Sequence, residues 1–233
     1  MFIGKKKEKK TMSLDQSATL EQQIHEFNAQ LATQAPPQVV DQFSQHINTL
    51  IASGVEKNAL KVGEKAPSFT LPDALGRQVS LAGLLQQGPV VVTFYRGEWC
   101  PYCNLQLHAY QQVLPQIKEL GASLIAISPQ TPDHSLSLSE KHELAFPVLS
   151  DQGNLVARQF GLAYSIEEQT RTLLKSLGSD IAAFNGDESW ELPVPGTFII
   201  SQDGTIRLTY ADADYTHRLE PSALLDGLRT MSK

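Results

Sequence analysis

The stretch that most constrains the fold is a buried apolar run followed at once by a pair of cysteines that open a helix. Residues 90–94 read Val-Val-Val-Thr-Phe, which is typical of a strand covered on both faces. Gly97 breaks this run, and apolar residues then recur at helical spacing from Leu107 to Leu120. A strand, a sharp turn and a helix in this order predict one unit of an α/β fold.

The two cysteines of the chain, Cys100 and Cys103, stand where this helix begins. Pro101 suits the first helical position, because an N–H there would have no partner anyway. This placement puts Cys100 at the N-cap and Cys103 one turn later on the same face. Unpaired N–H groups and the positive end of the helix dipole stabilise a thiolate, so the pKa of such a cysteine falls from ~8.5 to roughly 3.5–7.5.

Two charged residues stand close to this pair in the sequence. Arg96 adds a positive charge four residues before Cys100, and we expect Glu98 to face solvent, because an inward carboxylate would oppose a thiolate. A thiolate attacks a disulfide, or a peroxide oxygen to give a sulfenic acid that a neighbouring thiol closes into a disulfide. Both thiols are present within one turn, so the sequence predicts a redox site.

Other interpretations of a Cys-x-x-Cys motif are weaker here. A zinc site needs further Cys or His ligands at matching spacing. The chain has no second cysteine pair, and its six histidines form no helical pair at ligand spacing. A static disulfide at a helix start, or two buried inert thiols, remain as structural alternatives. We therefore predict catalytic cysteines, no metal and no cofactor.

Composition and charge exclude several classes of function. With 233 residues and 41% hydrophobic content, the chain can form one α/β domain with an appendage. A formal charge of −6 argues against a general nucleic-acid-binding surface. No apolar run approaches the roughly 18–20 residues of a membrane span. The lysine-rich start, MFIGKKKEKK, lacks the apolar stretch of a signal peptide, so we expect a cytoplasmic protein in a reducing compartment.

Residues 1–57 are predicted to form a basic tail and a helical N-terminal extension. Two amphipathic helices are expected between residues 14 and 54, split by Pro36 and Pro37, with Gly54 as a C-cap. Their apolar stripes either pack on the same chain or form a homodimer contact, and the sequence does not separate these two possibilities.

Residues 58–233 are predicted to form the α/β domain. Residues 161–191 are its least regular part, and their position between a predicted helix and a strand favours a flap over the thiols. The expected strands are 69–71, 78–81, 90–94, 123–128, 147–149, 197–201 and 206–210; besides the helix at the cysteines, the expected helices lie within 129–144, 154–160, 166–177 and 221–228.

Three segments of the chain carry a further signal: FYRGEWCPYC, FTLPDALGRQVSL and LPVPGTFIISQDGTIR. Together they resemble the peroxiredoxin-like branch of the alkyl hydroperoxide reductase/thiol-specific antioxidant (AhpC/TSA) family. The resemblance covers about residues 60–228. It implies a thioredoxin-like fold, with a central mixed sheet flanked by helices. It also implies a thiol peroxidase that reduces hydrogen peroxide or organic hydroperoxides and is recycled by thioredoxin or a similar dithiol.

The chain departs from the family pattern at the reactive cysteine. Typical members carry Thr or Ser three residues before that cysteine and Pro seven before it. Counting back from Cys103 finds Cys100 and Arg96, and counting back from Cys100 finds Gly97 and Thr93. In this branch the second cysteine aligns with the peroxidatic position, whereas nearness to the helix end favours the first. Both are kept as catalytic, and the candidates that stabilise the thiolate or substrate are Thr93, Arg96, Trp99, Val194 and Pro195.

The expectations for Val194 and Pro195 concern the loop before the strand expected at residues 197–201, and a further expectation concerns Arg218. An X-Pro bond is cis in only about 5–6% of cases, but the resemblance implies a cis Pro195 facing the cysteines. The backbone N–H and C=O of Val194 would then meet an extended substrate. The motif DADYTHRLEP matches the same branch; its Arg218 either reaches the site or, as we favour, pairs with Asp212 or Asp214.

Two other functions remain open. The first is a general thiol–disulfide oxidoreductase with little peroxidase activity, for which Trp99 beside Cys100 is a candidate contact with a redox partner. The second is a redox-inert interaction module.

Overall fold

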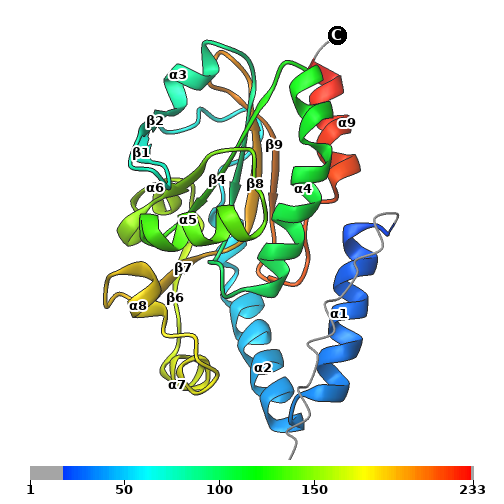
Figure 1. Cartoon of the computed structure of the whole chain (residues 1–233), viewed down its shortest axis with the longest axis vertical. Helices are drawn as coiled ribbons and strands as arrows, with labels where there is room; N and C mark the ends of the chain where they lie inside the picture. The colour runs from blue at the N-terminus through cyan, green and yellow to red at the C-terminus, as the bar shows by residue number, and fades with distance from the viewer. Residues whose placement is uncertain (1–17, 232–233) are drawn as a thin grey trace, which may run out of the picture.

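A five-stranded mixed sheet forms the centre of the molecule (Figure 1). The computed structural model describes residues 18–231, so the predicted basic tail lies outside the described residues. The strand order is β5-β4-β3-β8-β9; β3, β4 and β5 run parallel, and β8 is antiparallel to both β3 and β9. The strands are β3 (Val90–Phe94), β4 (Ser123–Ser128), β5 (Val148–Ser150), β8 (Gly196–Ile200) and β9 (Ile206–Ala211).

The apolar run at residues 90–94 is the central strand, and all five of its residues are buried. Helices cover both faces of the sheet, with α4 and α9 on one side and α5 and α6 on the other (Figure 1). This arrangement confirms the predicted α/β class. The helices are α4 (Pro101–Glu119), α5 (Pro132–Lys141), α6 (Leu155–Gln159) and α9 (Pro221–Met231).

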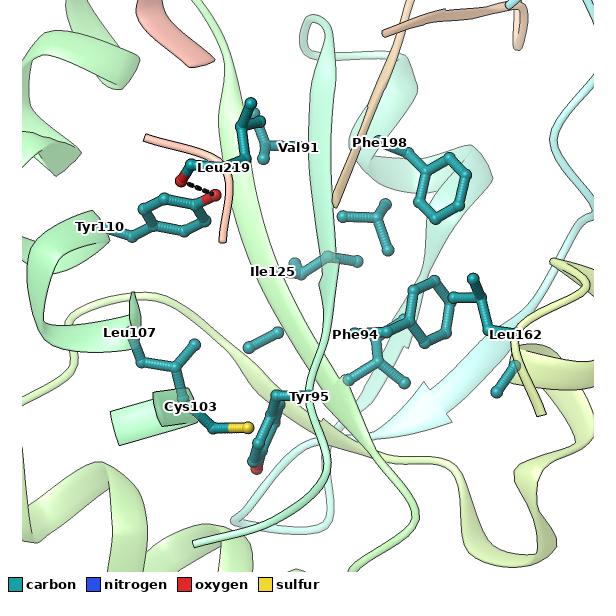
Figure 2. Close-up of a cluster of buried hydrophobic side chains, with 14 of the residues drawn as sticks. Val91, Phe94, Tyr95, Cys103, Leu107, Tyr110, Ile125, Leu162, Phe198 and Leu219 are labelled. Carbon is teal, nitrogen blue, oxygen red and sulfur yellow. Dashed lines mark hydrogen bonds between the residues drawn. The ribbon is translucent and has the colours of Figure 1, made fainter. Parts of the chain in front are cut away.

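The sheet divides the core into two halves (Figure 2). On one face the rings of Phe94, Phe160 and Phe198 pack together, with centroids 4.9 Å apart for the first two and 5.0 Å for the last two. On the other face Leu107 and Tyr110 of α4 lie with Cys103, so one cysteine is part of the core. The rigid centre of the fold therefore positions the start of α4.

The smaller elements partly match the prediction. The hairpin of β1 and β2 is confirmed, as is a helix in the segment of residues 161–191. That segment also holds β6, which pairs antiparallel with β7 at the end of the segment; both strands were missed because three-residue strands are too short to show alternation. These elements are β1 (Thr70–Pro72), β2 (Gln78–Ser80), α3 (Leu81–Leu85), β6 (Ala163–Ser165), α7 (Glu168–Ser176), α8 (Ile181–Asn185) and β7 (Glu191–Pro193), with 3₁₀ turns η1 (Val55–Asn58) and η2 (Gln152–Asn154).

The N-terminal extension is a pair of helices that packs on its own chain. Helices α1 (Leu20–Gln34) and α2 (Pro37–Ser53) are split by the predicted proline pair, and Gly54 ends α2 in a left-handed conformation. Leu20, Ile24 and Leu50 are buried. In Figure 1, α1 runs beside α4, and both N-terminal helices contact the main body. We call α1 and α2 the arm; a homodimer contact stays a prediction.

The start of the arm is fixed by a residue from the far end of the chain. The Glu220 carboxylate accepts hydrogen bonds from the backbone N–H groups of Leu20 and Glu21, with N···O distances of 3.3 Å and 2.6 Å. These N–H groups have no partner within the helix, and a negative charge at this end is favourable. Within residues 18–231, no helix has both the length and the hydropathy to cross a bilayer.

We predict that Glu220→Ala loosens the arm. Loss of the carboxylate at the N-terminal end of α1 is expected to lower the free energy of unfolding by about 0.5–2 kcal/mol. It is also expected to speed amide hydrogen exchange in α1. Glu26→Ala, on an exposed position of the same helix, is the control. Equal exchange rates in the two variants would show that Glu220 does not hold the arm.

Candidate active site at the start of helix α4

The predicted position of the cysteine pair is confirmed. Cys100 is the N-cap of α4, Pro101 is its first residue, and Cys103 follows within the first turn. Both cysteines are free thiols and fully buried. The turn before them is closed by the Cys100 N–H, which donates to the carbonyl oxygen of Gly97 at 3.1 Å.

Arg96 lies against the first cysteine. Its Nη1 is 4.0 Å from Sγ of Cys100. The guanidinium stands over the ring of Tyr215 at 3.8 Å and over that of Trp99 at 4.9 Å, and only 3% of the residue is exposed. A cation held between aromatic faces and away from water acts on a nearby sulfur with little screening. Arg96 therefore lies next to the Cys100 sulfur, and its role in stabilising a thiolate stays a prediction.

The second cysteine has a different set of donors. The backbone N–H of Arg96 donates to Sγ of Cys103 at 3.4 Å, and Nη2 of Arg218 lies 3.6 Å from the same sulfur. Nη1 of Arg218 donates to Oε1 of Gln106 at 3.2 Å. Figure 2 shows the sulfur of Cys103 pointing toward Tyr95, inside the core.

These surroundings push the pKa values of the two thiols apart. Burial raises the pKa of Cys100, but the hydrogen bond with Cys103 and the charges of Arg96 and Arg218 outweigh burial and lower this pKa to about 5. Burial and the neighbouring Cys100 raise the pKa of Cys103 well above its usual value. At neutral pH the pair therefore holds one thiolate, on Cys100, and one thiol.

A cavity of about 240 Å³ reaches the first cysteine. Cys100 lines this cavity and Cys103 does not. Helix α7 and the turn after it supply one wall, which supports the prediction that residues 161–191 cover the thiols. The remaining lining residues are Phe27, Leu31, Phe43, Ile47, Arg96, Trp99, Pro101, Tyr102, Leu174, Leu177, Ser179 and Tyr215.

Thr93 lies in the core and bonds to another threonine. Its hydroxyl is 3.0 Å from that of Thr197 on β8, and both residues are buried. The Thr197 hydroxyl in turn accepts from Nε2 of Gln106 at 3.4 Å. Thr93 thus belongs to the network that ends at Arg218 and Cys103, and its connection to the sulfur is indirect.

The expectation for Val194 and Pro195 is wrong in its geometry. No peptide bond between residues 18 and 231 is cis, so Pro195 follows a trans bond. The N–H of Val194 donates to the carbonyl oxygen of Leu162 at 2.8 Å, and Val194 is fully buried. This bond continues the pairing of β6 with β7 and leaves that N–H unable to meet a substrate.

The favoured role of Arg218 is also wrong. The residue that contacts Asp212 and Asp214 is His217, whose ring nitrogens lie 2.9 Å and 3.7 Å from the two carboxylates. Arg218 instead turns inward and is 7% exposed. The sequence alone does not show which of two adjacent basic residues points outward.

The prediction that Glu98 faces solvent is wrong. Its carboxylate Oε1 lies 2.7 Å from Nδ1 of His134 on α5, and 18% of its side chain is exposed. Its N–H donates to Oε1 of Gln130 at 2.8 Å. The turn before α4 is thereby attached to the loop after β4, and an interaction with His134 holds the carboxylate.

Gly97 is required because Trp99 folds back over it. Its φ is 154°, and a Cβ at this position would lie 2.3 Å from Nε1 of Trp99. Trp99 is partly exposed, lines the cavity and contacts the Arg96 guanidinium. Its predicted contact with a redox partner stays a prediction.

Sequence analysis missed two residues of this site. Gln106 stands three residues after Cys103 on the same helix face, a spacing that was available as a signal. Tyr215 supports Arg96 from a loop, and no local pattern marks it. The described part of the chain contains no group of three or more His, Cys, Asp or Glu residues placed to hold a metal ion.

The AhpC/TSA family model matches residues 62–209. Peroxiredoxin Q, chloroplastic, of Gentiana triflora is 30% identical over 148 residues, which are 64% of this chain and 58% of that protein. Peroxiredoxin Bcp of Escherichia coli (strain K12) is 36% identical over 105 residues, 45% of this chain and 67% of that protein. The matched part of the chain thus spans about 58–67% of the length of these relatives.

Solved structures share the fold. Peroxidoxin BcpB from Mycobacterium tuberculosis superposes with a TM-score of 0.59 at 24% identity, over 74% of this chain and 98% of that chain. A peroxiredoxin-like protein from Aquifex aeolicus gives a TM-score of 0.59 at 13% identity, over 74% of this chain and 88% of that one. These likenesses confirm the predicted thioredoxin-like fold.

We predict that alkylation of Cys100 by iodoacetamide, mapped by mass spectrometry, rises with pH through a midpoint near 5, because the thiolate is the reactive form. Below this pH the thiol form prevails and labelling falls. Arg96→Gln is expected to raise the midpoint by about 1–3 units, since it removes an opposite charge. Arg207→Gln, at an exposed arginine, is the control. A wild-type midpoint near that of free cysteine would contradict the assignment.

We predict that Gly97→Ala displaces the Trp99 indole, because the new methyl group and the ring cannot occupy the same space. The expected result is a red-shifted tryptophan emission and slower alkylation of Cys100. Gly204→Ala, also at a positive φ but with open space around its Cβ, controls for backbone strain. Equal emission spectra for the two variants would rule out the displacement.

Proposed function

Because the chain belongs to the AhpC/TSA family, we propose that it is a thiol-dependent peroxidase that reduces hydrogen peroxide or organic hydroperoxides through Cys100 and Cys103. The observation that carries the proposal is the division of roles at the start of α4. A thiolate at Cys100 faces a cavity, and a thiol at Cys103 lies behind it within one turn.

The first step is attack by the Cys100 thiolate on the terminal oxygen of the hydroperoxide. The S–O bond forms as the O–O bond breaks, which gives a sulfenic acid and an alkoxide or hydroxide that takes up a proton. Arg96 is the donor closest to the attacking sulfur on the cavity side. Its fixed charge stabilises the oxygen that becomes negative in the transition state.

The second step joins the two sulfurs. Cys103 attacks the sulfenic sulfur, a disulfide forms and water leaves with the proton of the thiol. Residues one turn apart have Cβ atoms about 5–6 Å apart, against the roughly 3.5–4.5 Å of a disulfide, so a modest change in the first turn suffices. Arg218 and the Arg96 N–H, as donors to Cys103, stabilise its thiolate as it forms.

The third step needs an external dithiol, and we propose thioredoxin or a similar protein. Two thiols of the donor reduce the disulfide and become a disulfide themselves, which restores both cysteines. Such a cycle requires a reducing compartment, and we therefore place the protein in the cytoplasm. In this proposal Cys100 attacks first, although Cys103 holds the position that aligns with the reactive cysteine of the family.

A general thiol–disulfide oxidoreductase is the alternative, since a low first pKa in Cys-x-x-Cys also suits that chemistry. One observation favours the peroxidase. Within residues 18–231, Cys100 is the only cysteine that borders the cavity, whose volume is about 240 Å³. This space admits a small hydroperoxide more readily than a protein disulfide.

We predict steady consumption of peroxide when the protein is supplied with thioredoxin, thioredoxin reductase and NADPH. Cys100→Ser is expected to lower the rate at least 100-fold. Cys103→Ser is expected to stop turnover and still consume one equivalent of peroxide, with the sulfenic acid trapped by dimedone on Cys100. The readout is NADPH oxidation together with mass spectrometry of the adduct.

Three results would contradict this proposal in different ways. A dimedone adduct on Cys103 in Cys100→Ser would reverse the roles of the two thiols. Reduction of insulin disulfides without peroxide consumption would favour the oxidoreductase. Unchanged behaviour of both variants in both assays would leave a redox-inert module.

A further inference from the structure

The cavity at Cys100 is partly built by the arm, which lies outside the matched family segment of residues 62–209. Phe27 and Leu31 of α1 and Phe43 and Ile47 of α2 line one wall. All four are apolar and half-buried. Thus a segment outside the family match borders the reactive sulfur.

The arm is attached to the turn that carries the cysteines. The hydroxyl of Tyr102, which stands between Cys100 and Cys103, donates to Oδ1 of Asn28 at 2.7 Å. The ring of Phe27 meets the Tyr102 ring edge-on, with centroids 5.3 Å apart. A hydrogen bond and an aromatic contact therefore fix the position of this wall relative to Cys100.

The cavity is lined mostly by apolar side chains. Its charged lining residue, Arg96, lies 4.0 Å from the sulfur of Cys100. Leu174 and Leu177, from α7 and its C-terminal end, face the cavity together with the arm. The cavity thus combines a positive charge, which can stabilise the reacting oxygens, with a lining that forms few hydrogen bonds to water or to polar groups.

The size of the cavity exceeds what hydrogen peroxide needs. A single water needs only about 10–15 Å³ of such space, against the 240 Å³ of this cavity. Hydrogen peroxide fills only a small part of that space. A hydroperoxide with an aryl-alkyl or branched alkyl group would fill it and bury apolar surface on both sides.

We propose that the arm is the specificity element of the site, and that Leu31 and Phe43 bind the apolar group of a bulky organic hydroperoxide. This inference rests on the proposed function. The thiolate of Cys100 attacks the terminal oxygen, the O–O bond breaks, and the organic group leaves as an alkoxide that takes a proton to become an alcohol. Reduction of the resulting disulfide by the dithiol proceeds as above.

The kinetic test compares two peroxides in the same variants. The preference is defined as kcat/KM for cumene hydroperoxide divided by kcat/KM for hydrogen peroxide. Leu31→Asn and Phe43→Asn are expected to lower this preference about tenfold or more, because one or two lost apolar contacts are worth roughly 10–200-fold. Gln45→Asn, at an exposed position of α2, is the matched control and is expected to keep the wild-type preference.

A binding test needs no turnover. Cumyl alcohol, the product from cumene hydroperoxide, is expected to slow alkylation of Cys100 in wild type in a saturable way and to lose this effect in Leu31→Asn and Phe43→Asn. Protection without peroxidase activity would support the apolar site while overturning the proposed function. Equal loss of both peroxide activities, or protection that survives in both arm variants, would overturn the role of the arm.

Discussion

The charge of Arg96, held out of water beside Cys100, is the interaction on which the site depends. Removing an ion from water costs several kcal/mol even after relaxation, so a buried guanidinium needs compensation. Here it comes from the faces of Tyr215 and Trp99 and from the sulfur, 4.0 Å away. The thiolate and the guanidinium stabilise each other, and the low pKa of Cys100 is one consequence of that pairing.

The two sulfurs show how strongly position decides reactivity within one helical turn. Cys100 faces the cavity and Arg96, whereas Cys103 sits among core residues and takes its donors from the Arg96 backbone and Arg218. Behind Cys103 a chain of hydrogen bonds runs through Gln106 and Thr197. A buried network of this kind fixes the orientation of the arginine.

The sequence predicts the part of the site that is local. The apolar run, Gly97 and Cys100-Pro101 determine a strand, a turn and a helix start from neighbouring residues alone, and all three are present. The thioredoxin-like fold follows from the resemblance. The cavity could not be predicted, because its walls come from residues far apart in sequence. The inward turn of Arg218 depends on tertiary packing and hydrogen bonding that no local pattern records. The trans bond before Pro195 is the ordinary form of an X-Pro bond, and the cis expectation came from the family resemblance.

The partners of both sulfurs come late in the chain. Tyr215 packs its ring on Arg96, Arg218 donates to the sulfur of Cys103, and Glu220 accepts hydrogen bonds at the start of α1. Each contact joins residues at least 110 positions apart in the sequence. While the ribosome is still translating the first 210 residues, these contacts do not exist. A nascent chain that ends before residue 210 therefore lacks the Arg218 charge, which helps to lower the pKa of Cys100, and the Tyr215 ring that packs on Arg96.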